Sequence, residues 1–292
     1  MALVLTACAD DGGGDAGGEG GTLDGETINI AVFNGWDEGI AASFLWGHIL
    51  EEEGATVEYT FAEPGLTFSG VAGGSADISF DAWLPNTHAD YWDKFGGDLE
   101  DLGAWYDEAP LTIAVNADAP IQSLDELADN AEEMGGRIVG IEPGAGLTRI
   151  TRDEVIPTYG LEDMEFVESS TSAMLQELDT ALAAGDNIVV TLWQPHWAYA
   201  AYDIRNLEDP ENALGDPEQI KTFARSGFSD DYPEVAEWVQ NFRLTEEQLT
   251  AIEDIMVVQN ESASDEEYAA SIDEWIEQNP DYIEQLKAGE LS

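Results

Sequence analysis

Short apolar runs and segments of helical period alternate along most of the chain. Residues 27–33 form an apolar run of strand length, whereas residues 37–53 carry apolar side chains on one helical stripe and end before Gly54. The same criteria predict further strands at 56–61, 76–80, 111–116, 137–142, 165–169 and 187–193. They also predict helices at 147–159 and 172–184, and one opened by the capping box Ser123-x-x-Glu126. This alternation indicates an α/β fold with mostly parallel sheets.

From about Gln219 onward the pattern becomes almost wholly helical. The clearest segments are 232–242, 245–256 and 265–278. With 292 residues, of which 43% are hydrophobic, the chain can bury a large core, and we expect it to fold as two lobes or domains. No apolar run reaches the roughly 18 residues that a membrane-spanning helix needs, so we expect no transmembrane segment.

The chain is strongly acidic. Its 9 Lys and Arg stand against 62 Asp and Glu, which gives a net charge of −53. Nucleic acid and anionic membrane surfaces are therefore poor partners, because phosphate binding needs clustered Lys and Arg. We interpret the carboxylates as a heavily hydrated surface. Such a surface suits a saline habitat, where counterions screen its self-repulsion.

The only cysteine, Cys8, excludes an intramolecular disulfide. Its context, Leu5-Thr6-Ala7-Cys8, resembles the bacterial lipoprotein cleavage box, in which the cysteine becomes the lipidated first residue of the mature chain. A stretch rich in Gly and Asp follows and predicts a flexible tether. The apolar stretch before Cys8 is shorter than an ordinary signal core, which leaves an incidental thiol as the alternative.

Three tryptophans stand in short motifs that suggest a site for a small cation. They are Trp36 in Gly35-Trp36-Asp37-Glu38, Trp83 in Asp81-Ala82-Trp83-Leu84-Pro85-Asn86-Thr87-His88, and Trp193 in Thr191-Leu192-Trp193-Gln194-Pro195-His196-Trp197. A quaternary ammonium donates no hydrogen bond, so a protein binds it with aromatic faces, whose negative quadrupoles attract the charge. Each motif follows a predicted strand, as does Pro143-Gly144-Ala145-Gly146-Leu147, and ligands of open α/β sheets bind at the carboxyl ends of strands.

Over residues 27–286 the sequence resembles the substrate-binding proteins of glycine betaine ABC importers, the osmoprotectant uptake family. The likeness is carried by Gly35-Trp36-Asp37, Ala82-Trp83-Leu84-Pro85-Asn86-Thr87-His88, Gly140-Ile141-Glu142-Pro143-Gly144-Ala145-Gly146-Leu147 and Leu192-Trp193-Gln194-Pro195-His196-Trp197. It implies a two-lobed, hinged periplasmic-binding-protein fold of type II, with the ligand between the lobes. One lobe would comprise 27–111 and 215–292 and the other 112–214, after a signal remnant and tether at 1–26.

The resemblance also implies the site and the partners. Trp36, Trp83 and Trp193 would form an aromatic box around the trimethylammonium, and His88 with the backbone amides of Gly146 and Leu147 would hold the carboxylate. The ligand would be glycine betaine or proline betaine, with no cofactor and no metal. The monomeric protein would work outside the cytoplasm with the transmembrane subunit of an ABC permease, joined to the membrane only through a lipid anchor at Cys8.

Elementary chemistry agrees with this assignment. Gly146 and Leu147 stand where a Gly-rich turn becomes a helix, and the free amides at a helix N-terminus favour an anion. A cation box with an anion clamp fits a zwitterion, whereas choline has no carboxylate. A choline-binding or sugar-binding importer subunit remains the alternative, because aromatic platforms also bind those ligands.

An enzyme is the rival class. The three histidines are scattered, the cysteine stands apart from them, and the sequence has no G-x-S-x-G elbow and no phosphate-binding G-x-x-x-x-G-K-[ST] loop. Abundant Asp and Glu could still hide a glycosidase-like carboxylate pair. We expect the remaining tryptophans to fill the core and His48 to be structural. His196 is expected mainly to bond a neighbouring backbone group.

Overall fold

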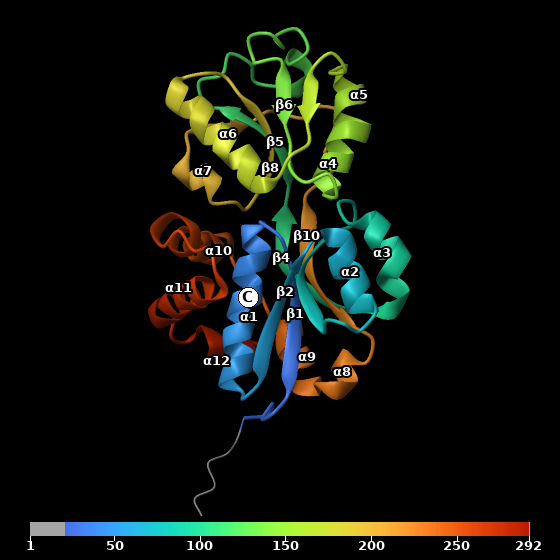
Figure 1. The fold of residues 1–292 in the computed structure, drawn as a ribbon, viewed down its shortest axis with the longest axis vertical. Coiled ribbons are helices and arrows are strands. Elements are labelled where there is room, and N and C mark those ends of the chain that lie inside the picture. The colour runs from blue at the N-terminus through green and yellow to red at the C-terminus, as the bar shows by residue number, and fades with distance from the viewer. Residues whose placement is uncertain (1–20, 292) are drawn as a thin grey trace, which may run out of the picture.

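The computed structural model describes residues 21–291, which form two lobes, each built on one five-stranded sheet (Figure 1). Cys8 and most of the expected tether lie outside these residues. The sheet of the first lobe has the order β2-β1-β3-β10-β4, and that of the second lobe has the order β7-β6-β8-β5-β9. The strands are β1 (Thr27–Phe33), β2 (Thr56–Ala62), β3 (Ile78–Leu84), β4 (Leu99–Ala109), β5 (Leu111–Asn116), β6 (Arg137–Val139), β7 (Glu165–Val167), β8 (Val189–Trp193), β9 (Ile204–Asn206) and β10 (Glu218–Arg225).

Helices cover both faces of the sheets. In the first lobe they are α1 (Asp37–Glu52), α2 (Pro64–Ala72), α3 (Ala89–Phe95), α8 (Phe228–Asp231), α9 (Pro233–Asn241), α10 (Glu246–Glu253), α11 (Asp265–Gln278) and α12 (Tyr282–Ala288). In the second lobe they are α4 (Gly146–Ile150), α5 (Ile156–Tyr159), α6 (Thr171–Ala184) and α7 (Ala198–Ala201). Short 3-10 turns span Gly96–Asp98 and Leu124–Glu126, and π-helical turns span Thr151–Val155 and Asp254–Gln259.

Helix α1 lies between the first sheet and the C-terminal helices, so it is buried on nearly all sides. It packs against β1 and β3 and, on its other side, against α10 and α11 (Figure 1). Gly39 faces Asp81 of β3 so closely that a Cβ would lie 2.4 Å from the carboxylate oxygen Oδ2. A glycine is therefore required where α1 crosses β3. Asp37 and Glu38 directly precede this crossing point.

The prediction of mostly parallel sheets needs correction, because both sheets are mixed: in each, four strands run in one direction and one strand is antiparallel to its two neighbours. In the first sheet β2, β1 and β3 run parallel, but β10 is antiparallel to both β3 and β4. In the second sheet β7, β6 and β8 run parallel, and β5 is antiparallel to β8 and β9. Strand β5 follows β4 after the single residue Pro110, so the chain enters the second sheet at the edge where β8 ends, and Leu111, the first residue of β5, pairs with Trp193, the last residue of β8. Strand β5 therefore runs away from this edge, antiparallel to β8.

Several predicted elements need correction in detail. The segment from Gln219 is not helical at first, because Glu218–Arg225 forms β10, which lies between β3 and β4 in the first sheet. Ser123 opens only a 3-10 turn, because its hydroxyl donates to the carbonyl of Glu208 instead of capping a helix. Helices α2 and α3 and strand β4 were absent from the predictions altogether.

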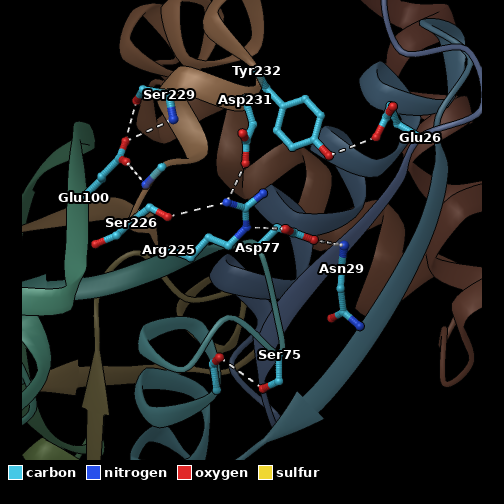
Figure 2. A network of polar contacts seen from close by, with 12 residues as sticks. Glu26, Asn29, Ser75, Asp77, Glu100, Arg225, Ser226, Ser229, Asp231 and Tyr232 are labelled. Atoms are coloured by element: carbon cyan, nitrogen blue, oxygen red, sulfur yellow. Dashed lines mark hydrogen bonds and ion pairs between the residues drawn. The ribbon is translucent and has the colours of Figure 1, made fainter.

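A polar network at the end of β10 fastens this returning strand to the base of the first lobe (Figure 2). The Arg225 guanidinium lies 2.7 Å from an Asp77 oxygen and 2.8 Å from an Asp231 oxygen. The second Asp77 oxygen accepts the backbone N–H of Asn29, and Glu100 accepts the N–H groups of Gly227 and Ser229. The C-terminal end of β10 and the loop that follows it are thus held by contacts with Asp77, Asp231 and Glu100.

Candidate functional site

A small pocket lies between the carboxyl ends of the two sets of strands. Its lining comes from both lobes and from the crossing strand β5. The lining residues are Trp36, Glu38, Trp83, Thr87, His88, Leu111, Ile141, Ala145, Leu147 and Trp193.

The structure brings the three predicted tryptophans together in this pocket. Trp36 follows β1, Trp83 lies near the end of β3, and Trp193 is the last residue of β8. All three are at most 5% exposed, and the rings of Trp36 and Trp193 stand edge to face with centroids 6.3 Å apart. The Trp83 indole N–H donates to Asp81 at 2.8 Å, which fixes the orientation of that ring. Three aromatic surfaces from two lobes therefore enclose one space.

His88 joins them as a neutral hydrogen-bond donor. Its Nδ1 accepts the backbone N–H of Trp83 at 2.9 Å, so the ring proton must sit on Nε2. Within residues 21–291 no group lies at hydrogen-bonding geometry to this Nε2, although the side chain is fully buried. Burial, with a smaller contribution from the Arg149 charge, lowers the pKa of His88 to about 3. The pocket wall thus carries a buried N–H group that a ligand oxygen can use.

Helix α4 supplies the second group of donors. It begins at Gly146 after Ala145, so the amides of its first residues have no acceptor inside the helix. Leu147 and Ala145 line the pocket, whereas Gly146 itself does not. Instead, Gly146 abuts the other lobe, because a Cβ there would lie 2.1 Å from the carbonyl oxygen of Thr87. Gly146 is therefore a position at which the two lobes approach each other too closely for a larger side chain.

Glu218 holds the loop that presents His88. Its carboxylate accepts the backbone N–H groups of Asn86, at 2.5 Å, and of Thr87, at 3.0 Å, as well as the Thr87 hydroxyl. The side chain is 3% exposed and comes from β10, 131 residues further along the chain than Thr87. Sequence reasoning missed Glu218, because nothing in its own neighbourhood points to the loop.

Buried carboxyl groups lie behind the tryptophans and were likewise missed. Glu38 lines the pocket at 1% exposure, and burial, with the nearby Asp37 charge, raises its pKa to about 8, although the indole N–H groups of Trp193 and Trp83 oppose the shift. Burial and the charge of Glu38 also raise the pKa of Asp81. The acidic pair in Gly35-Trp36-Asp37-Glu38 is the local signal in the sequence that could have pointed to Glu38.

The other singled-out residues lie outside the pocket. Trp46, Trp105 and Trp275 are core residues, each at most 1% exposed. His48 lies on the surface side of α1, 2.8 Å from Asp273. His196 is buried against Trp193, and its Nδ1 accepts the backbone N–H of Ala198, as expected. No cluster of three or more potential ligands in residues 21–291 is arranged to hold a metal ion, and no helix in that range is long and apolar enough to cross a membrane.

The arrangement suits a small ligand with two unlike ends. Aromatic faces and the Glu38 carboxyl gather around Trp36, Trp83 and Trp193, whereas N–H donors gather at His88 and at the start of α4. A cation without donors fits the first group, and an anion fits the second.

Comparison with known proteins gives a consistent result. A family model described as the substrate-binding domain of the ABC-type glycine betaine transport system matches residues 26–278. The glycine betaine/carnitine transport binding protein of Listeria monocytogenes is 35% identical over 161 residues, which cover 54% of this chain and 51% of that protein. The matched segment thus spans about half the length of that relative.

Solved structures share the fold over most of the chain. Lactococcal OpuAC, in its closed conformation complexed with glycine betaine, superposes with a TM-score of 0.81 at 28% identity, covering 89% of this chain and 99% of that one. A choline-binding ABC-transporter protein in complex with choline has the same TM-score of 0.81 at 24% identity, covering 90% of this chain and 92% of that one. Because both proteins share the fold, the two-lobed architecture alone does not distinguish a betaine site from a choline site.

Proposed function

The chain belongs to the family of substrate-binding domains of ABC-type glycine betaine transport systems, and on this premise we propose that it captures glycine betaine or a related zwitterion such as proline betaine for an ABC importer. As a member of this family it is a binding protein rather than an enzyme. The observation that carries the proposal is the buried Nε2–H of His88, which has no partner within residues 21–291 and belongs to a residue that lines the same pocket as three tryptophans. Choline offers no oxygen anion for this donor.

Approximate binding free energies indicate that micromolar affinity needs both the aromatic box and the carboxylate contacts. Three desolvated cation–π contacts contribute about 6 kcal/mol at about 2 kcal/mol each. Association itself costs at least about 4 kcal/mol, and micromolar affinity requires about −8 kcal/mol overall. The cation box alone therefore falls short. Contacts of the carboxylate with His88 and with the amides of Gly146 and Leu147 would supply most of the remainder.

We also propose the limits of the two lobes and the ligand contacts that each lobe contributes. One lobe comprises 27–111 and 215–292, and the other 112–214; the direct passage through Pro110 and the return of the chain as β10 support these limits. Trp36, Trp83 and His88 then approach the ligand from one lobe and Trp193 with the start of α4 from the other. The ligand stabilises the closed form, which the permease would recognise. We propose further that the protein is a monomer outside the cytoplasm, anchored through a lipid on Cys8.

The carboxylate end is tested by replacing the histidine. His88→Ala should weaken glycine betaine binding by about 1 to 3 kcal/mol, the range for a lost hydrogen bond to a charged group. Choline, without a carboxylate, should lose almost nothing. Calorimetric titration of both ligands into wild type and variant, at fixed salt because of the net charge of −53, measures the difference.

His48→Ala is the matched control, because His48 lies on the surface of α1 away from the pocket. It should leave both affinities unchanged. Equal losses for glycine betaine and choline in His88→Ala would mean that the histidine shapes the pocket without binding the carboxylate, and the assignment of a zwitterion site would fail.

A further inference from the structure

Two contacts join the lobes on opposite flanks of the pocket without lining it. On one flank the indole N–H of Trp197 donates to Asp37 Oδ2 at 2.8 Å. On the other flank the guanidinium of Arg149 lies 2.9 Å from the carbonyl oxygen of Asn86 and 3.4 Å from Asp90 Oδ2. Figure 1 shows α7, which follows Trp197, above α1 and α10, and α4, which carries Arg149, above α2 and α3.

The Trp197 contact lies directly beside the aromatic box. Asp37 follows Trp36 in sequence, and Trp197 stands in the loop that begins after Trp193. Both side chains are half-buried. Burial raises the pKa of Asp37 to about 6, and the hydrogen bond from Trp197 opposes the shift. The carboxylate is thus partly removed from water and depends on a donor that belongs to the other lobe.

A further buried carboxyl group, Glu253, increases the contribution that an N–H donor from Trp197 makes to holding the lobes together. Glu253 of α10 is fully buried, and burial together with the charges of Glu38 and Asp37 raises its pKa. Its oxygens meet no donor at bonding geometry within residues 21–291, although the Trp197 backbone N–H lies near enough to oppose the shift in part. Trp197 therefore brings its indole N–H to a part of the first lobe that is otherwise rich in carboxyl groups.

The Arg149 contact is more exposed. The side chain of Arg149 is 31% exposed and that of Asp90 74%, so solvent screens the ion pair strongly. The hydrogen bond to the Asn86 carbonyl lies in the loop that carries His88. Nearby, the Tyr91 hydroxyl donates to the Gly144 carbonyl at 2.9 Å across the same boundary. This flank should hold the lobes together less firmly than the Trp197 flank.

We propose that Trp197 with Asp37, and more weakly Arg149 with Asn86 and Asp90, form a closing latch that sets the lifetime of the ligand-bound state. The proposal rests on the proposed capture of a betaine between the lobes. These residues are positioning residues, because they act on the closing equilibrium and touch no ligand. Breaking the latch therefore lowers the affinity for every ligand of the site by one common factor. The loss should lie in dissociation, since the ligand enters the open form, in which the latch contacts are not made.

Kinetics test the latch. Trp197→Phe keeps a ring but removes the donor, and Arg149→Met keeps the length of the side chain but removes its charge. Stopped-flow measurements with glycine betaine and proline betaine should show dissociation about 10-fold faster for Trp197→Phe, which corresponds to about 1.4 kcal/mol, and about 3-fold faster for Arg149→Met. Association rates should stay within about twofold. Each factor should be the same for both ligands.

The chain offers matched controls. Arg152→Met removes an arginine near α4 whose partners, Asp153 and Glu168, lie in its own lobe. Trp238→Phe changes a tryptophan in contact with Lys287 on the first lobe. Both should leave the rates unchanged. Dissociation of Trp197→Phe within twofold of wild type, or losses that differ between the two ligands, would overturn the latch.

Ligand-free protein separates this inference from the proposed function. One dye on each lobe, in a Cys8→Ser background, reports the closed fraction by single-molecule energy transfer. Trp197→Phe should reduce the ligand-free closed fraction about 10-fold and Arg152→Met should not. An unchanged fraction contradicts the latch even if betaines bind. If the wild type binds no betaine, the proposed function fails. The closed fraction of the ligand-free protein still decides whether the latch exists.

Discussion

Replacing any one tryptophan of the pocket by alanine is expected to weaken glycine betaine binding by about 1 to 3 kcal/mol, or roughly 5- to 150-fold. Trp36, Trp83 and Trp193 are each at most 5% exposed and line one pocket, so each removal takes away a dry aromatic face and leaves a cavity. Phenylalanine at the same positions should cost less, because part of the face remains. Calorimetric titration of each variant measures these losses.

The structure also indicates which tryptophan outside the pocket can serve as the control for these variants. Trp275 is unsuitable, because it is 1% exposed and packs edge to face on Tyr282, so its removal would disturb folding. Trp238 is only partly buried and lies beneath Lys287, far along the chain from the pocket residues. Trp238→Ala should keep the wild-type affinity. A loss there as large as in the pocket variants would refute the box assignment.

Gly146→Ala is expected to lower the affinity for glycine betaine by roughly 5- to 150-fold. The added Cβ would lie 2.1 Å from the carbonyl oxygen of Thr87, whose loop Glu218 holds rigidly through the N–H of Thr87 at 3.0 Å. Overpacking of this kind typically costs about 1 to 3 kcal/mol, and here it falls on the closed form. The same titration measures the loss.

Gly144→Ala provides the matched control, because a Cβ at Gly144 meets its nearest atom only at 3.8 Å. It should bind nearly as well as wild type. The melting temperature of ligand-free Gly146→Ala should also stay close to wild type, since the clash arises between the lobes rather than inside one. Wild-type affinity in Gly146→Ala would show that the lobes do not close as the structure has them.

The candidate site could be read from the sequence because its residues stand in short motifs at strand ends. Trp36, Trp83, His88 and Trp193 each needed only a local signal, and the common position of strand ends in an α/β sheet brought them together. Their function as ligand contacts remains a prediction that the experiments above test. The role of the Gly146 amide at the carboxylate stays a prediction, and the tight approach of Gly146 to Thr87 depends on the closed arrangement of two lobes, which no local pattern encodes.

What the sequence did not reveal depends on distant partners. Strand β10 was mistaken for the start of the helical tail, because its alternation is weak and its partners β3 and β4 lie more than 100 residues away. Glu218 and Glu253 looked like two more carboxylates among 62 acidic residues. Only the fold shows that one orders the loop of His88 and that the other lies buried beside the lobe boundary. The direction of β5 likewise follows from the direct connection through Pro110.

The most direct test of the central claim is a calorimetric titration of the wild-type protein with glycine betaine at fixed salt. We expect saturable binding of one ligand per chain with a dissociation constant in the micromolar range, and much weaker binding of choline, because the pocket joins three aromatic faces with the buried N–H of His88. Absence of binding at millimolar glycine betaine, with the protein shown to be folded, would contradict the account.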